Sequence, residues 1–173
     1  MEREEVKRRL AERFGDKLKI AERSPKRVFV YAENEIWVDL ARFLFDDLGA
    51  RYDTGLAVDD RDGVEVMFFF PFDKEDFFVT MKTFVPKPNP VLNSITPVCP
   101  GAKWIEREMF EMYEVTFRNH PDPRPLLRAD TMPADYYPAK REVKDEHPTV
   151  RERDDGDWMA GQVFGESPDG ENP

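Results

Sequence analysis

Phenylalanine and proline are separated along this 173-residue chain, and that separation constrains the fold more than any other feature. Eleven of the 14 phenylalanines lie at or before Phe84, whereas 13 of the 15 prolines lie after it. Phenylalanine builds cores because it buries a large apolar area, while proline lacks a backbone donor and favours extended or turn conformations. We therefore expect one ordinary-sized domain over residues 1–128 and an extended tail over 129–173.

Hydrophobic spacing and turn residues predict three helices and five strands. The most regular pattern covers residues 34–48, where Asn34 is expected to cap a helix and Gly49 to follow its end. The apolar stripe of this helix consists of Trp37, Leu40, Ala41, Leu44 and Leu48. Further helices are expected over 2–13 and 102–114, and strands over 17–21, 27–31, 51–58, 64–70 and 77–85.

Short acidic loops separate the last three predicted strands, at residues 59–63 and 73–76. Loops of this length favour antiparallel hairpins, and no internal repeat indicates a solenoid. The predicted fold is therefore α+β. It consists of a mostly antiparallel sheet of four to five strands, backed by helices, with a long extended Pro-rich C-terminal arm.

The predicted helix over 102–114 combines an apolar stripe with many charges. Its stripe consists of Ile105, Met109, Met112 and Tyr113 at helical spacing. Glu106, Arg107, Glu108 and Glu111 are expected on the other faces, either solvated or, for Glu106 and Arg107, in structural or interface ion pairs. An Arg107–Glu111 pair at i,i+4 contributes only about 0.2–0.5 kcal/mol, so local helix stability does not explain the charge density.

A proline-rich segment follows this helix and reads His120-Pro121-Asp122-Pro123-Arg124-Pro125. Three prolines in five residues remove backbone donors and hold φ near −65°, and each residue before a proline is pushed toward an extended conformation. We expect a stiff arm that leaves the helix.

Charge, hydropathy and terminal residues narrow the function classes. A net charge of −10 disfavours binding to nucleic acid phosphates. The longest nearly unbroken apolar run, residues 66–72, is far shorter than the roughly 18–20 residues of a transmembrane helix. The N-terminal residues lack the basic and then apolar layout of an export signal, and Cys99 has no second cysteine for a disulfide. These features predict a cytosolic protein.

Catalytic and metal-binding alternatives find little support in the residues. Cys99 and His120 are a conceivable nucleophile and base, and the carboxylates of Glu106, Glu108 and Glu111 a conceivable acid/base group, but no oxyanion-hole or cofactor motif accompanies either. One cysteine and two histidines do not supply four thiolates for an iron–sulfur cluster or a closed zinc site. The acidic run at 59–62 fits a hairpin turn better than a calcium loop. We expect no cofactor on this protein.

The tail contains spaced apolar residues within a polar, Pro-rich sequence. Tyr136, Tyr137, Trp158, Met159, Val163 and Phe164 are candidate anchors for pockets on another subunit. The alternative is a disordered tail, because the composition offers little apolar surface to bury.

A resemblance to a known family rests on the run W-I-E-R-E, followed by V-T-F and then H-P-D-P-R-P-L-L, between Trp104 and Leu127. This order and spacing resembles the family of the thirty-kilodalton subunit of complex I (NADH-quinone oxidoreductase), which includes the related subunit of membrane-bound [NiFe] hydrogenases. The resemblance covers residues 80–127. The sequence departs from the pattern at Glu111, where the family has aspartate, at Glu114, where it has glycine, and in a reduced set of basic residues, Arg124 and Arg128.

The resemblance implies a redox-inactive subunit in the peripheral arm of a membrane complex, on the cytoplasmic side. Its implied partners are the large catalytic subunit and the adjacent iron–sulfur subunit, which hold iron–sulfur clusters and, in hydrogenases, nickel–iron; the membrane arm is contacted indirectly. The residues implied in partner binding or structure are Trp104, Glu106, Arg107, Glu108, Glu111, His120, Pro121 and Arg124.

Three functional interpretations stay open at this point. The short acidic chain and its departures favour an archaeal-type membrane-bound hydrogenase or its sulfur-reducing relative. The thirty-kilodalton subunit of NADH-quinone oxidoreductase itself is the alternative within the family. Outside the family, an adaptor of an unrelated assembly or a stand-alone hydrolase is the competing class.

Overall fold

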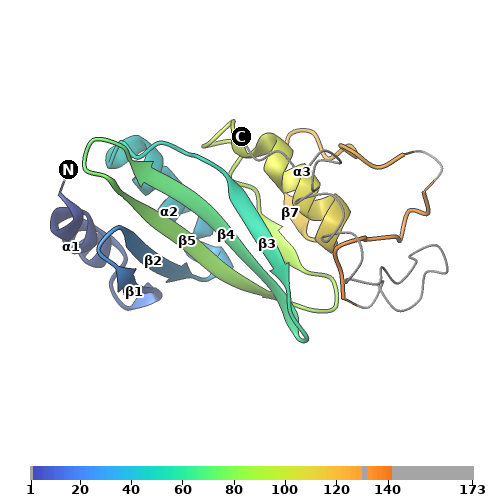
Figure 1. The fold of residues 1–173 in the computed structure, drawn as a ribbon, viewed down its shortest axis with the longest axis horizontal. Helices are drawn as coiled ribbons and strands as arrows, with labels where there is room; N and C mark the ends of the chain where they lie inside the picture. The colour runs from blue at the N-terminus through green and yellow to red at the C-terminus, as the bar shows by residue number, and fades with distance from the viewer. Residues whose placement is uncertain (1, 130–131, 142–173) are drawn as a thin grey trace, which may run out of the picture.

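A five-stranded sheet with helices on one face forms the body of the protein (Figure 1). The computed structural model describes residues 2–129 and 132–141. The helices are α1 (Arg3–Phe14), α2 (Asn34–Arg42) and α3 (Ala102–Tyr113), with a 3-10 turn η1 (Gly15–Lys17) and a π-helical turn η2 (Phe43–Asp47). The strands are β1 (Leu18–Ser24), β2 (Arg27–Ala32), β3 (Gly55–Asp59), β4 (Gly63–Phe72), β5 (Phe77–Pro86), β6 (Val91–Asn93) and β7 (Thr116–Arg118).

The main sheet has the strand order β1-β2-β5-β4-β3. Both hairpins expected from the acidic loops are present, because β3 pairs with β4 and β4 pairs with β5, each antiparallel. The central pair β2–β5 is parallel, since α2, β3 and β4 lie between these strands in the sequence and return the backbone to the same end of the sheet. The predicted α+β fold with a mostly antiparallel sheet is therefore confirmed.

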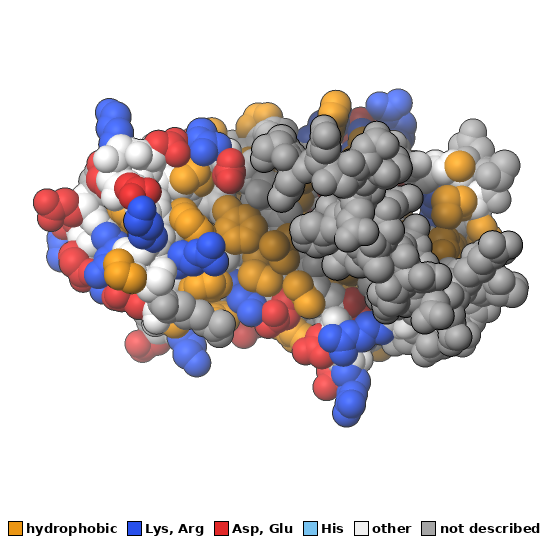
Figure 2. Space-filling model, viewed as in Figure 1, with side chains coloured by type: hydrophobic (Ala, Val, Ile, Leu, Met, Phe, Trp, Pro, Cys, Tyr) orange, Lys and Arg blue, Asp and Glu red, His pale blue; other side chains and the backbone are white. Residues whose placement is uncertain are grey.

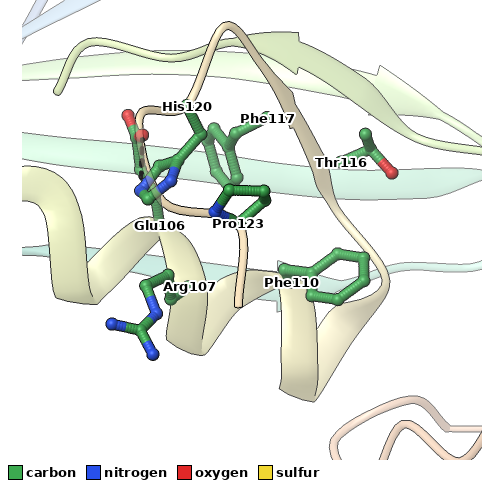
Figure 3. A pocket seen from close by; sticks show the side chains of 7 residues that line it. All are labelled: Glu106, Arg107, Phe110, Thr116, Phe117, His120 and Pro123. Carbon is green, nitrogen blue, oxygen red and sulfur yellow. Dashed lines mark ion pairs between the residues drawn. The ribbon is translucent and has the colours of Figure 1, made fainter. Parts of the chain in front are cut away.

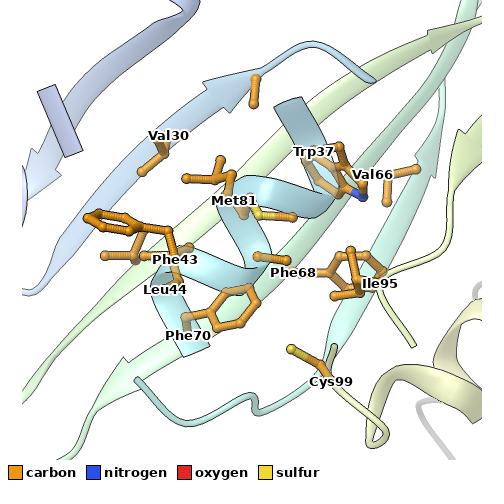
Figure 4. Close-up of a cluster of buried hydrophobic side chains, with 14 of the residues drawn as sticks. Val30, Trp37, Phe43, Leu44, Val66, Phe68, Phe70, Met81, Ile95 and Cys99 are labelled. Carbon is orange, nitrogen blue, oxygen red and sulfur yellow. The ribbon is translucent and has the colours of Figure 1, made fainter. Parts of the chain in front are cut away.

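The core lies between the sheet and the layer of α1 and α2 (Figures 1 and 4). All five residues of the predicted apolar stripe of the second helix are buried. Trp37 of this stripe packs its ring 5.8 Å from that of Phe68, which points from β4 into the same layer. Alternation along β4 and β5 supplies the opposite wall, with side chains such as Phe70 and Met81 fully buried.

Two predicted details near α2 and β3 differ from the structure. Asn34 is the first helical residue and not the cap, and its side-chain oxygen accepts the backbone N–H of Asn93 at 2.9 Å. Strand β3 begins at Gly55 and not at residue 51, although Arg51 and Asp53 still donate backbone hydrogen bonds to β4. In both cases a contact with a distant segment replaces the local arrangement.

A second, two-stranded sheet formed by β6 and β7 was not predicted. Its parallel register pairs Leu92 with Phe117, and both side chains are buried. Three-residue strands are too short to show a periodic pattern. This small sheet positions the ends of the segments that enclose α3.

Helix α3 lies beyond the β3 edge of the main sheet and ends at Glu114 (Figure 1). Glu114 has the left-handed conformation, with φ 66° and ψ 15°, that favours glycine at this position. Its carboxylate pairs with the ammonium group of Lys140, which brings residues 132–141 against the end of the helix. In the part of the protein that the structure describes, no helix is both long and apolar enough to cross a membrane.

Candidate functional site

Helix α3 and the segment after β7 form one interlocked unit. We call residues 120–128 the return segment, because the chain returns to the start of α3 at His120 and then follows the helix instead of leaving it. This corrects the expectation of an arm that projects from the helix. The correction has a physical cause: carboxylate and guanidinium groups of α3 bind the backbone of the return segment, and prolines limit its other conformations.

Glu106 is fully buried, with 0% of its surface exposed, and fastens α3 to the residues after β6. One carboxylate oxygen accepts hydrogen bonds from the hydroxyls of Ser94, at 2.5 Å, and Thr96, at 2.8 Å. The other oxygen accepts the backbone N–H of Ile95 at 2.7 Å. Three donors from one tight turn therefore converge on a single side chain.

Burial raises the pKa of Glu106 from 4.5 to about 7, and the hydrogen bonds from Ser94, Ile95 and Thr96 oppose that rise. Desolvation disfavours the charged carboxylate, whereas donors stabilise it. The two influences leave a buried carboxyl group that changes its protonation near neutral pH. The role of Glu106 is structural, since all three donors belong to the turn that its side chain holds against α3.

His120 joins the start of the return segment to the start of α3 (Figure 3). Its Nε2 lies 3.0 Å from the carbonyl oxygen of Lys103, and its Nδ1 accepts the backbone N–H of Asp122 at 3.0 Å. A carbonyl only accepts and a backbone N–H only donates, so these partners assign the neutral tautomer with hydrogen on Nε2. The same Nε2 lies 3.8 Å from the carboxylate of Glu106. His120 thus connects the start of α3 with the start of the return segment.

Glu111 caps the far end of the return segment, and 1% of its surface is exposed. Its carboxylate accepts three backbone N–H groups, from Leu126 at 2.6 Å, Leu127 at 2.7 Å and Arg128 at 3.1 Å. Burial alone raises the pKa of Glu111, but these backbone donors and the charge of Arg128 outweigh it and lower the pKa below its ordinary value. The ionised carboxylate of Glu111 is therefore the form that binds the return segment.

Arg107 holds the middle of the return segment. Its guanidinium donates to the carbonyl oxygens of Arg124, at 2.6 Å, and Pro125, at 2.5 Å. Asp122, next to Pro121, is bound by Arg124 and by Lys103, which together hold the pKa of Asp122 well below its usual range. Arg107 Nη1 also lies 3.6 Å from the carboxylate of Asp122, so Arg107 forms an ion pair with the return segment as well as binding its backbone.

The expected solvated face of α3 is thus wrong for Glu106 and Glu111, and Arg107 does not pair with Glu111. The periodicity of an isolated helix identifies one packing face, whereas α3 packs against β3 on one side and against the residue 94–96 turn and return segment on others. Ser94 and Thr96, which bind Glu106, were not predicted as site residues. The resemblance alone included their segment.

A small apolar hollow opens between α3 and the return segment (Figure 3). Its volume is about 70 Å³, and it is lined by Glu106, Arg107, Phe110, Thr116, Phe117, His120 and Pro123. Pockets for small-molecule ligands commonly measure about 300–1,000 Å³. The hollow is therefore too small for a substrate, although it accommodates part of one apolar side chain.

The structure also gives no support to a Cys99–His120 catalytic pair or, among the described residues, to a metal site. Cys99 is buried, and burial raises the pKa of its thiol to about 12, which disfavours the nucleophilic thiolate. Both nitrogens of His120 are occupied by backbone partners. Across residues 2–129 and 132–141, no group of three or more His, Cys, Asp or Glu side chains is placed to hold a metal ion.

The remaining predicted site residues lie at the surface or outside the described residues. Trp104 is 66% exposed on α3, and Glu108 is also exposed. Tyr137 packs its ring edge-to-face on Phe110, with 6.3 Å between centroids, so it contacts the protein's own helix. Tyr136 is partly buried nearby. Trp158 and Phe164 lie outside the described residues.

Comparisons with known proteins agree with this architecture. A sequence model of the family described as respiratory-chain NADH dehydrogenase, 30 Kd subunit, matches residues 30–149. A subunit of the NADH-quinone oxidoreductase of Chloroherpeton thalassium is 31% identical over 142 residues, which are 78% of this chain and 58% of that protein. A subunit of the F(420)H(2) dehydrogenase of Methanosarcina mazei is 28% identical over 63% of this chain and 71% of that protein.

A solved structure shares the fold at lower identity. One polypeptide of the membrane-bound sulfane sulfur reductase, an archaeal respiratory membrane complex, superposes with a TM-score of 0.70 and 16% identity; the match covers 87% of this chain and 94% of that polypeptide. The match therefore covers nearly the whole length of this structural relative. By contrast, the protein spans 58% of the length of the C. thalassium relative.

Proposed function

This chain belongs to the family of the 30 kDa subunit of respiratory-chain NADH dehydrogenase, and from that premise we propose that it is a redox-inactive peripheral-arm subunit of a membrane-bound, complex I-like oxidoreductase. The observation that carries the proposal is the family match over residues 30–149, which includes α2, β3–β7, α3 and the return segment. The interlocked contacts of Glu106, Arg107 and Glu111 support a scaffolding role, because they use the charged groups of α3 to make the domain rigid.

The proposed partners are the large catalytic subunit and an adjacent iron–sulfur subunit, on the cytoplasmic side of the membrane. Electron transfer in such a complex would use iron–sulfur clusters, with or without nickel–iron, that the partners hold. In this proposal α3 presents Trp104 to a partner, and residues 129–173 continue the domain as a partner-binding tail. Rigidity in the return segment would fix the direction in which that tail starts.

Two kinds of complex compete within the family. An archaeal-type hydrogenase or sulfur-reducing complex is supported by the fold, which superposes on a polypeptide of a sulfane sulfur reductase with a TM-score of 0.70. An NADH-quinone oxidoreductase is supported by the 31% identity with the C. thalassium protein. We favour the first, because the sequence is acidic and departs from the family pattern at Glu111 and Glu114.

The test is to tag the full-length protein in its native cell, solubilise membranes gently, and identify the proteins and metals that co-purify. Recovery with nickel and iron–sulfur subunits would support a hydrogenase-type complex. Iron–sulfur subunits without nickel would support a quinone- or sulfur-linked complex. Recovery of the tagged protein alone would overturn the proposal and favour an unrelated adaptor or a stand-alone hydrolase.

Trp104→Ala is expected to reduce recovery of the partner subunits without changing the melting temperature of the purified protein. Exposed tryptophans at interfaces commonly contribute about 2 kcal/mol or more to binding, roughly a thirtyfold change in affinity. The matched control is Asp39→Ala, an exposed residue of α2. Equal recovery of partners with both variants would remove Trp104 from the interface.

Ending the protein after Arg141 tests the proposed tail. This position preserves the contacts of Tyr137 with Phe110 and of Lys140 with Glu114, while it removes Trp158 and Phe164. We expect an unchanged thermal unfolding curve and a lower recovery of partners in the tagged purification. Full recovery would show that the tail is dispensable for assembly.

A further inference from the structure

The face of the main sheet opposite α1 and α2, which we call the open face, carries mostly apolar side chains. Strand registers bring together Leu56 with Met67, and Phe69 with Thr80, while Phe78 packs its ring edge-to-face on that of Phe69 at 6.2 Å. Viewed from this side, hydrophobic side chains gather over the strands (Figure 2). Leu56, Val58 and Phe84 are 40%, 41% and 47% exposed.

Such a face is unusual for a sheet with helices on one side. Antiparallel sheets with a solvated face normally alternate apolar and polar residues, whereas sheets covered on both faces have near-continuous apolar strands. Strand β4 reads G-V-E-V-M-F-F-F-P-F and is of the second kind. The sequence of β4 therefore indicates a cover over Met67 and Phe69.

Charges around the open face indicate the chemistry of that cover. Lys19 and Arg27 are exposed on β1 and β2, and Arg27 lies over the ring of Phe78 at 5.1 Å. Lys82 lies nearer the middle, paired with Glu65 at 2.7 Å and over the ring of Tyr31 at 5.6 Å. Glu65 offsets Lys82, so Lys19 and Arg27 leave the strands of this face with an excess of positive charge. Asp16 and Glu33 lie at the end of the face, in a hollow that Lys19 and Phe84 also line. Acidic groups on a partner would complement the strand cations.

The size of the open face suits a protein partner. Five strands of 5–10 residues, about 4.8 Å apart with a rise of about 3.3 Å per residue, cover on the order of 600 Å². One partner's share of a standard protein interface is about 800 Å². The outline of the open face is therefore of the same order as one partner's share of an interface.

We propose that the open face is a docking surface for another subunit of the same complex, one that presents aliphatic or aromatic side chains with Asp or Glu at their margin. This inference rests on the proposed function for the existence of the complex. It adds a contact surface separate from Trp104, since the open face belongs to the main sheet and Trp104 to α3.

Cysteine labelling in the assembled complex tests the inference. Val58→Cys and Phe84→Cys place thiols on the edge strand β3 and on the central strand β5 of the open face. Ala11→Cys, at an exposed position of α1, is the control. Native Cys99 gives little background because it is buried. We expect maleimide to label the two open-face thiols roughly tenfold more slowly in the complex than in the purified full-length protein, because labelling requires the interface to open. The control should react equally in both.

A photo-crosslinker on the Phe84→Cys thiol identifies the cover. The expected adduct joins one partner subunit through a peptide with apolar residues beside Asp or Glu. Equal labelling in an intact complex, or an adduct to lipid alone, would overturn the inference and leave the proposed function standing. Protection already present in the purified protein would also overturn it. If that protection is lost after truncation at Arg141, the cover is the protein's own tail. If the protection depends on protein concentration, the cover is a second copy of the protein. Failure of the unaltered protein to co-purify with any partner would overturn both proposals.

Discussion

Replacing Glu111 with alanine is expected to detach the return segment from α3 and to lower the free energy of unfolding by about 3 kcal/mol. The estimate follows from hydrogen bonds to a charged acceptor, each of which contributes about 1.5–3 kcal/mol, discounted because water reaches the freed backbone donors. The carboxylate accepts the backbone N–H groups of Leu126, Leu127 and Arg128 at 2.6–3.1 Å. Urea unfolding of the purified protein measures the loss.

Hydrogen exchange makes the Glu111 prediction specific to the return segment. The amides of residues 126–128 should exchange much faster in Glu111→Ala, while those of the main sheet should keep their order of protection. Glu111→Gln should have an intermediate effect, since an amide retains one acceptor oxygen. Glu108→Ala on the exposed side of the same helix is the control and should change stability by less than about 0.5 kcal/mol. Slow exchange at residues 126–128 in Glu111→Ala would show that the cap is not what holds them.

Glu106 is expected to make the protein less stable as the pH rises toward neutrality. Its folded-state pKa of about 7 lies above the ordinary value of 4.5, so the folded protein binds the proton more tightly than the unfolded chain does. The protonated Glu106 side chain therefore contributes to the free energy of unfolding. This contribution is fully present below pH 4.5 and is lost as the pH rises through 7. A difference of this size corresponds to about 3 kcal/mol, which opposes the usual stabilisation of proteins between acid and neutral pH.

Comparing Glu106→Gln with the unaltered protein isolates this effect. The amide keeps the shape of the side chain and has no charge to desolvate, so its stability should change less between pH 5 and pH 8. The difference between the two stability curves cancels the titrations that the proteins share. Glu108→Gln, which removes an exposed carboxylate, should follow the unaltered protein. Parallel curves for all three proteins would mean that the buried carboxylate does not titrate in this range.

The main sheet could be predicted because its information is local. Alternation in β4 and β5, acidic turns between the strands and the apolar stripe of α2 each lie within one short window of sequence. The same windows do not report the parallel pairing of β2 with β5, since two strands separated by a helix and two other strands carry no mark of their partner. Local sequence patterns therefore predict the individual helices and strands, but they do not predict the order of the strands in the sheet.

The site could be predicted only in its location. The run of residues 104–128 singled out the right helix and segment, yet it predicted a solvated face for Glu111, and a solvated face or an ion pair for Glu106. A carboxylate in a helical pattern looks the same whether water or a returning backbone surrounds it. The decisive donors for Glu106 come from Ser94, Ile95 and Thr96, and those for Glu111 come from residues 126–128. Such contacts follow from how segments meet, which no periodicity within α3 can encode.

The parallel pair at the centre of the sheet also bears on the order of events during synthesis. Strand β5 begins at Phe77, 45 residues after β2 ends at Ala32. At about 5–20 residues per second, a ribosome needs roughly 2–9 s to make that stretch. During this interval the β1–β2 hairpin has an unpaired inner edge, which is a template for incorrect association with other proteins. The edge of β2 therefore stays unpaired until β5 has been made, because α2 covers a face of the sheet and not this edge.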